Sequence, residues 1–114
     1  MTAAEFRRIA RSLPEVVESS HMDHPDFRVG AQIFATLGYP DKGWAMVKLF
    51  PDQQQNFMKS MPRVFAPANG AWGRKGATLV NLKSAKKAEL QKAMLAAWLN
   101  TAPKKLAAKY PAGK

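Results

Sequence analysis

Apolar residues recur along the chain with two different spacings, and each spacing predicts a different kind of element. Helical spacing follows a capping box at Thr2 and Glu5, recurs after Pro51, and extends over a long stretch that contains Leu90 and Trp98. The predicted helical segments are one that Pro14 ends, residues 51–60, residues 85–100 behind a Ser84 cap, and a turn of residues 104–106 before a frayed tail to Lys114.

Between these helices, short alternating apolar runs are separated by turn residues and predict strands. The predicted strands are residues 16–20, 27–29, 32–37, 44–49, 64–66 and 77–82. The resulting order, α-β-β-β-β-α-β-β-α-α, predicts an α+β fold in which antiparallel hairpins are covered by helices. The length of 114 residues is most simply one domain.

The stretch between the last two predicted strands is the most unusual part of the sequence. Three glycines within residues 70–76 allow tight turns and positive φ. Among them stand one large aromatic residue, Trp72, and the adjacent cations Arg74 and Lys75. This pattern predicts a β-hairpin with a charged tip, and we expect Trp72 to be largely buried at its base.

The composition excludes several classes of protein. The sequence has no cysteine, so disulfides, thiolate zinc sites and cysteine nucleophiles are ruled out. Arginines stand near the N-terminus where a signal peptide needs an apolar core. The longest apolar run, residues 93–99, is far shorter than the ~20 residues of a membrane span. We therefore expect a soluble, cytoplasmic protein with no membrane partner.

The charge of the chain is unevenly distributed. Residues 1–62 contain seven basic and seven acidic side chains, whereas residues 63–114 contain eleven basic side chains and a single acid, Glu89. The whole net charge of +10 therefore lies in the second half. Such asymmetry indicates a polyanionic partner, most commonly nucleic acid. A solvated basic surface that serves only solubility is the alternative.

Cations at turn-rich positions and in the second half are the predicted nucleic-acid contacts. Arg74 is the best candidate for contact with a base or the minor groove because its guanidinium group is planar and bidentate. The lysines would supply point charge to the phosphate backbone. The predicted site residues are Arg74, Lys75, Lys42, Lys86, Lys87, Lys104 and Lys105. The predicted partner is duplex DNA, bound with weak sequence preference.

Two other functions compete with DNA binding. A protein-interaction or chaperone-like module for an acidic partner predicts a contiguous apolar patch rimmed by lysines, whereas DNA binding predicts a basic concavity between hairpins. An enzyme would use His21, Asp23, His24 and Asp26, but a zinc site needs three or four converging ligands. No P-loop or nucleophile elbow is present. We therefore predict a turn with ordinary hydrogen bonds there, and no catalytic residue, metal or cofactor.

Several segments of the sequence, taken together, resemble the MmcQ/YjbR family. The likeness runs in register from about Phe6 to Pro103 and is most distinctive in His24-Pro-Asp-Phe-Arg28 and in Gly70-Ala-Trp-Gly-Arg-Lys-Gly-Ala-Thr78. It implies a compact α+β "double wing" fold whose wings are two β-hairpins, and a DNA-binding assignment that is inferred largely from fold. It implies no enzymatic activity and supplies no base-reading residues. One departure is Phe50, where relatives often carry a small hydroxyl residue that caps the second helix.

Overall fold

The computed structural model describes residues 1–110, and the tail expected to fray therefore falls largely outside it, in residues 111–114. Within the described residues the helices are α1 (Ala3–Arg11), α2 (Pro51–Ser60), α3 (Gly70–Arg74), α4 (Lys87–Thr101) and α5 (Lys104–Lys109). The strands are β1 (Val17–His21), β2 (His24–Val29), β3 (Gln32–Leu37), β4 (Trp44–Lys48), β5 (Phe65–Pro67) and β6 (Ala77–Asn81).

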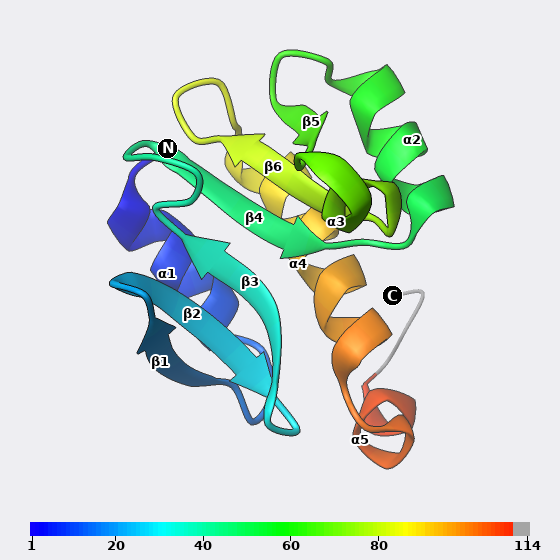
Figure 1. The fold of residues 1–114 in the computed structure, drawn as a ribbon. Helices are drawn as coiled ribbons and strands as arrows, with labels where there is room; N and C mark the ends of the chain where they lie inside the picture. Colours follow the sequence, from blue (N-terminus) through cyan, green and yellow to red (C-terminus); the bar gives the residue numbers. More distant parts are fainter. Residues whose placement is uncertain (111–114) are drawn as a thin grey trace.

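The strands form one antiparallel sheet in the order β1-β2-β3-β4-β6-β5 (Figure 1). The predicted α+β class and element order are confirmed, with the short helix α3 as an unpredicted addition. None of the helices in residues 1–110 has both the length and the apolar character needed to span a membrane.

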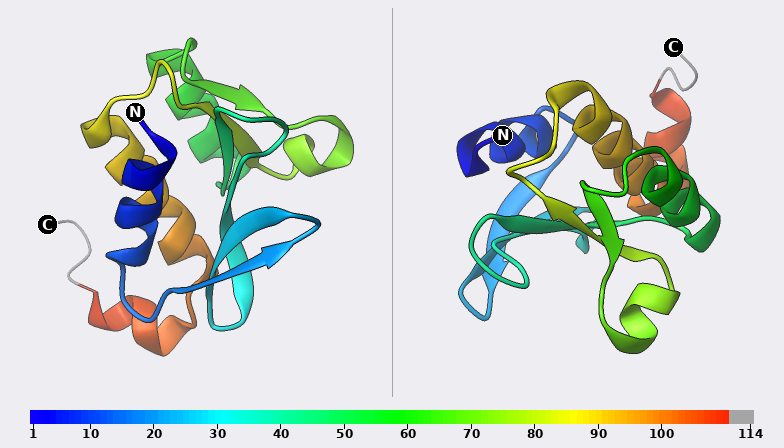
Figure 2. Two further views of the ribbon diagram at one scale, coloured as in Figure 1. Left: turned by 90° about the vertical axis from the view of Figure 1, so that its left-hand side faces the viewer. Right: turned by 90° about the horizontal axis from the view of Figure 1, so that it is seen from above.

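Helices α1 and α4 cover one face of the sheet, and α3 lies on the opposite face (Figure 2, right). The covered face holds the main core, in which Phe6, Phe27, Val47, Met94 and Trp98 are buried. Because side chains alternate along a strand, Ala45 and Val47 of β4 enter this core, while Met46 and Lys48 point to the opposite face. The register of the sheet therefore decides which side chains remain available for function.

The N-terminal caps of α1, α2 and α4 differ in how far they agree with the sequence. At α1, the Thr2 hydroxyl accepts from the Glu5 amide at 3.1 Å, which confirms the predicted capping box. At α2, the Phe50 side chain cannot cap the helix. The Phe50 amide nevertheless donates to Gln53 Oε1 at 2.9 Å, which is one of the two hydrogen bonds of a capping box. The predicted Ser84 cap of α4 is wrong, because Ser84 lies in a turn and its amide donates to the Asn81 carbonyl at 3.2 Å. Helix α4 begins at Lys87 instead.

Two glycines explain why a helix, and not a plain hairpin tip, joins β5 to β6. A Cβ atom on Gly73 would lie 1.7 Å from the Ala68 carbonyl oxygen, and one on Gly76 would lie 1.9 Å from that of Leu49. Both positions are thus close backbone approaches that only glycine permits. They bring α3 directly onto the backbone of neighbouring segments.

Candidate functional site

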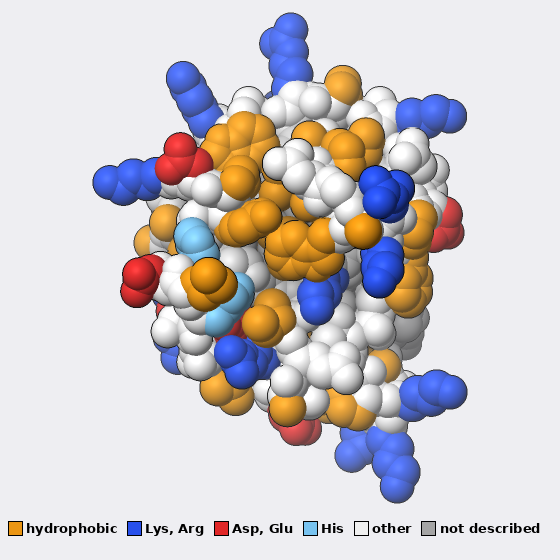
Figure 3. All heavy atoms as spheres, in the orientation of Figure 1, with side chains coloured by type: hydrophobic (Ala, Val, Ile, Leu, Met, Phe, Trp, Pro, Cys, Tyr) orange, Lys and Arg blue, Asp and Glu red, His pale blue; other side chains and the backbone are white. Residues whose placement is uncertain are grey.

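The face opposite α1 and α4, here called the open face, is the side of the sheet that carries α3. Viewed from this side, hydrophobic side chains gather in the middle, with lysine and arginine side chains on all sides of them and histidines to the left (Figure 3). The register shows which strand residues belong to it. Asp26 pairs with Thr36 and Thr36 pairs with Met46, so these three residues share the open face, and Lys48 follows Met46 on the same side of β4.

A second, small hydrophobic cluster supports the open face. Met46, Ala68 and Ala77 are buried in it, and Tyr39 and Leu79 pack partly against it. The cluster lies between the sheet and the segment that contains α3. It provides an apolar base against which the Tyr39 ring packs.

Helix α3 is held to the rest of the molecule by buried hydrogen bonds. The Gln54 amide nitrogen, on α2, donates to the carbonyl oxygens of Gly73 and Ala77, each at 3.0 Å. The Thr78 hydroxyl donates to the Gly76 carbonyl at 2.8 Å. Gln54 and Thr78 are both buried, so these bonds are shielded from water. A helix of only five residues is in this way fixed in place.

Trp72, on α3, keeps 38% of its surface exposed, so the predicted burial of this side chain is wrong. The physical reason is Gly73: its contact with the Ala68 backbone brings the helix so close to its neighbour that no side chain fits beneath it. The indole instead meets the Tyr39 ring in a T-shaped contact, with ring centroids 5.3 Å apart.

This contact is the end of a row of four rings. Tyr39 also meets His24 edge to face, with centroids 5.9 Å apart, and His24 meets His21 at 6.3 Å. The row runs from the β1–β2 hairpin across the face to α3. It joins parts of the chain that are distant in sequence into one aromatic surface.

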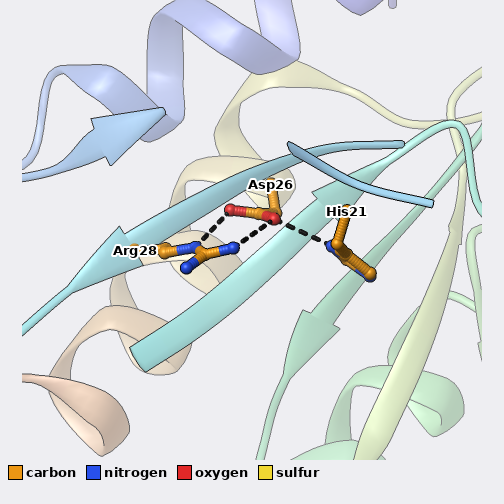
Figure 4. A network of polar contacts seen from close by, with 3 residues as sticks. All are labelled: His21, Asp26 and Arg28. Carbon is orange, nitrogen blue, oxygen red and sulfur yellow. Dashed lines mark hydrogen bonds and ion pairs between the residues drawn. The ribbon is translucent and has the colours of Figure 1, made fainter. Parts of the chain in front are cut away.

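The Asp26 cluster lies at the histidine end of the row. The buried Asp26 carboxylate accepts from Arg28 Nε at 2.8 Å and Nη2 at 3.1 Å, and from His21 Nδ1 at 2.8 Å (Figure 4). The hydrogen bonds from Arg28 hold the pKa of Asp26 below its ordinary value, the bond from His21 acts in the same direction, and burial opposes them. The carboxylate in turn raises the pKa of Arg28. Asp26 thus stays ionised and orients one guanidinium and one imidazole.

A cavity of about 290 Å³ opens at the α3 end of the row. Its charged side chains are Lys48, from β4, and Lys75, which follows α3; Trp72 and Phe50 supply aromatic surface. Asn100, near the end of α4, also lines the cavity and is fixed there, since its amide nitrogen donates to the Lys48 carbonyl at 3.3 Å. None of the described residues that line this cavity is acidic. Its positive charge is therefore not neutralised locally.

The arginines of α1 contrast with these lysines. Arg7 donates to Glu18 at 3.0 Å, and Arg11 lies 3.8 Å from the same carboxylate. Charge in the first half of the chain is thus partly cancelled by ion pairs. The uneven distribution of charge along the sequence is therefore also present on the surface of the folded protein.

The seven predicted contact residues lie in four separate places. Arg74 and Lys75 are at the end of α3, Lys42 is in the turn between β3 and β4, Lys86 and Lys87 are at the start of α4, and Lys104 and Lys105 are in α5. All seven side chains are exposed. The two lysine pairs of the helical layer are separated by the length of α4, roughly 20 Å for fifteen residues. The fold therefore brings Lys75 next to Lys48 and Trp72 but does not gather the whole set.

Three residues that position or charge the open face were absent from the predicted set: Arg28, Lys48 and Gln54. The strand alternation in residues 44–49 was a usable signal for Lys48, since it places Lys48 on the side opposite Val47. Nothing in the local sequence distinguishes Gln54 from the glutamines on either side of it. Its burial depends on how α2 packs against the segment after β5.

The predicted turn is shorter than expected: only Met22 and Asp23, both with positive φ, form it, while His24 to Asp26 lie in β2. His21 and Asp26 are bonded to each other, while Asp23 is exposed in the turn. Residues 1–110 contain no group of three or more His, Cys, Asp or Glu side chains that could hold a metal ion. The absence of catalysis and of a cofactor remains a prediction.

The fold and this face define an α+β protein built on one antiparallel sheet. Helices α1 and α4 cover one side of the sheet, and the short helix α3, which carries Trp72, lies on the other. A family model described as YjbR matches residues 11–100, and the chain therefore belongs to the YjbR family, in agreement with its predicted resemblance.

A solved structure shows the same fold. The crystal structure of Deinococcus radiodurans protein DR2400, with a domain described as DUF419, is 19% identical and superposes with a TM-score of 0.73. The likeness covers 87% of this chain and 77% of that one. No curated protein matches this chain.

Proposed function

We propose that this protein binds nucleic acid, in the first place DNA, through its open face. The observation that carries the proposal is the cavity that Lys48, Trp72 and Lys75 line together, with no acidic residue in its described lining. Two ammonium groups beside an exposed aromatic ring are suited to a ligand that is both anionic and aromatic. Nucleic acid is the commonest polymer with both properties.

The charges around the cavity support the same reading. Arg74 lies next to Lys75 and is exposed. On β2, the carboxylate of Asp26 is buried and paired with Arg28, so it presents no free negative charge on the open face. The second half of the chain carries a net charge of +10 with one acid, Glu89, which lies on α4 in the helical layer. A phosphate backbone at the α3 end of the open face would therefore meet Lys48, Arg74 and Lys75.

Binding of this kind works by counterion release. Each phosphate neutralised by a lysine or arginine frees condensed cations, which makes affinity strongly dependent on salt. Phosphate contacts carry no sequence information, so sequence preference is expected to be weak. Arg74 remains the residue best able to reach a base edge, because its guanidinium group can donate two parallel hydrogen bonds.

A second candidate function is the binding of an acidic protein. One observation favours it: Trp72 and Phe50, which both line the cavity, are 38% and 51% exposed, and lysines stand beside them. This is the apolar patch with a basic rim that such a module predicts. The two candidates differ in their ligand, and direct competition separates them.

The test is a titration of the full chain with duplex DNA, single-stranded DNA, heparin and poly-glutamate at several salt concentrations. If Arg28, Lys48, Arg74 and Lys75 all engage phosphates, the log–log salt slope on duplex DNA should be about −3.6. Replacing Arg74 and Lys75 together with glutamine should flatten it by about 2. Absence of binding to any DNA at low salt would refute the proposal, and tighter binding of poly-glutamate would favour the second candidate.

A matched pair of substitutions tells whether the open face is responsible. Lys104→Gln with Lys105→Gln removes the same amount of charge from α5. If the open face is the interface, this variant keeps the wild-type slope. If it flattens the slope as much as the α3 variant does, binding is spread over the basic surface predicted from the sequence, and the open-face assignment is wrong.

A further inference from the structure

We propose that the open face is a binding site for single-stranded nucleic acid, in which an unpaired base stacks on Trp72 while neighbouring phosphates contact Lys48 and Lys75. The inference rests on the proposed function and makes it specific. It names the strand form that is bound and the residue that selects it. Its basis is the geometry of the aromatic row and the placement of the cations around it.

Trp72 has the properties of a stacking platform. Its contact with Tyr39 is T-shaped, with an angle of 77° between the rings, so Tyr39 covers at most one of the two indole faces. The helix beneath it is fixed by Gln54 and by the close approach of Gly73 to Ala68. An exposed tryptophan on a rigid backbone loses little conformational freedom when a flat ligand binds.

The size and chemistry of the adjacent cavity fit one nucleotide. Its volume of about 290 Å³ lies at the small end of ligand pockets, so it suits a single base and not a dinucleotide cofactor. Lys48 and Lys75 lie beside Trp72 in the lining, where they can reach the phosphates that flank a stacked base. A base and its phosphate would thus be recognised together.

The other end of the row offers a second phosphate contact. Arg28 is held by Asp26 through Nε and Nη2, which leaves the Nη1 group of its guanidinium without a bond to that carboxylate. The rings of His24 and Tyr39 lie between the Asp26 cluster, which contains Arg28, and Trp72. Cations at both ends of a continuous aromatic surface match an extended strand that lies across the sheet.

Duplex DNA cannot use this arrangement in full. In a duplex every base is stacked on its neighbours, so no base face is free to lie on the indole unless the base is extruded. A duplex would use only the cations. The site therefore predicts a preference for single strands that disappears when the indole is removed.

The test uses the full chain and fluorescein-labelled oligo-dT, with a matched duplex as the second probe, followed by anisotropy. Trp72→Ala is expected to weaken oligo-dT binding about 5- to 150-fold, the range for loss of one stacked base. Duplex binding and the salt slope should stay near wild type. Replacing Lys48 and Lys75 together with glutamine should flatten the slope by about 1.8 on the duplex and by about 1.4 on oligo-dT.

Two further variants separate stacking from simple hydrophobic contact. Trp72→Phe keeps a π face and should retain most of the preference for oligo-dT, whereas Trp72→Leu keeps apolar bulk and should lose it. Melting curves of all variants check that the fold is intact. A thermally intact Trp72→Leu protein that binds oligo-dT like wild type overturns the inference.

The outcomes also distinguish this inference from the proposed function. Equal affinity for single strands and duplex, unaffected by Trp72→Ala but reduced by loss of the lysines, leaves the proposed function standing and refutes the stacking site. No binding to either probe at low salt refutes both. Loss of poly-glutamate binding on Trp72→Ala, together with no oligo-dT binding, assigns the face to an acidic protein instead.

Discussion

Trp98 and Trp72 are both tryptophans, on helices that lie on opposite faces of one sheet, but their surroundings differ. Trp98 is fully buried in the main core, and its indole nitrogen donates to the Pro14 carbonyl at 3.1 Å. Trp72 is 38% exposed, and its partner ring, Tyr39, is itself only partly buried. One face of the sheet therefore stabilises the fold, while the other presents an aromatic surface.

The difference has a simple structural origin. Helix α4 has fifteen residues, long enough to lay Leu90, Met94 and Trp98 along the sheet as one apolar stripe. Helix α3 has five residues and meets its neighbours through the backbone at Gly73. A helix that packs through glycine leaves its large side chain outside the contact.

The largest expected difference between the two faces is in stability. Trp98→Ala should lower the free energy of unfolding by about 3–5 kcal/mol, because it removes a fully buried aromatic side chain and its partly buried hydrogen bond to Pro14. Trp72→Ala should lower it by only about 1–2 kcal/mol, mostly through the lost contact with Tyr39. Urea denaturation of both variants measures this. Equal losses would show that the open face is a structural layer like the covered one.

A smaller loss of stability is expected when Gln54, which holds α3 in place, is replaced. Gln54→Ala removes two buried hydrogen bonds and should destabilise the protein by about 1–3 kcal/mol. The matched control is Gln55→Ala on the same helix, which is exposed and should change stability by less than about 0.5 kcal/mol.

If Gln54 holds the Trp72 platform, its loss should also weaken oligo-dT binding, although Gln54 itself is buried away from any ligand. Anisotropy measured on the folded Gln54→Ala protein checks this. A variant that loses stability but binds oligo-dT normally would show that α3 keeps its position without the anchor.

The smallest expected effect concerns pH. The pKa of Asp26 is lower in the folded protein than in the unfolded chain, so the charged carboxylate stabilises the fold above about pH 4. This contribution is lost as the pH falls through the folded-state value. Because Arg28 and His21 are each about one-third exposed, we expect only about 1 kcal/mol from Asp26→Asn at pH 7.

The measurement is the difference in unfolding free energy between wild type and Asp26→Asn from pH 7 to pH 2.5. It should be constant near neutrality and shrink below about pH 4. Asp23→Asn, in the exposed turn of the same hairpin, serves as the control and should show no such change. A difference that grows on acidification would mean that the sign assigned to Asp26 is wrong.

Much of the architecture could be predicted because its signals are local. Proline at the first position and periodic apolar residues predicted α2 with the bounds observed, Pro51–Ser60. The turn after β2 was read from Gly30, which indeed has a positive φ of 58°. Each of these features depends on residues that are neighbours in sequence, which is why pattern and turn chemistry were sufficient.

Local patterns failed where close approaches of the backbone decide the structure. The glycines of residues 70–76 were read as hairpin flexibility, but two of them are close approaches, Gly73 to Ala68 and Gly76 to Leu49. The distance to Leu49 in the sequence hides the second of these contacts. As a consequence, helix α3 was not predicted and Trp72 was expected to be buried.

The sequence alone determined the α+β class, the hairpins and the concentration of charge after residue 62, since these follow from periodicity, turn residues and composition. Tertiary packing sets which face of the sheet stays open and brings Lys48, Trp72 and Lys75 into the lining of one cavity. The physical reason is that strand pairing between β4 and β6, and the contacts of α3 with the segments around it, join residues that no local pattern connects.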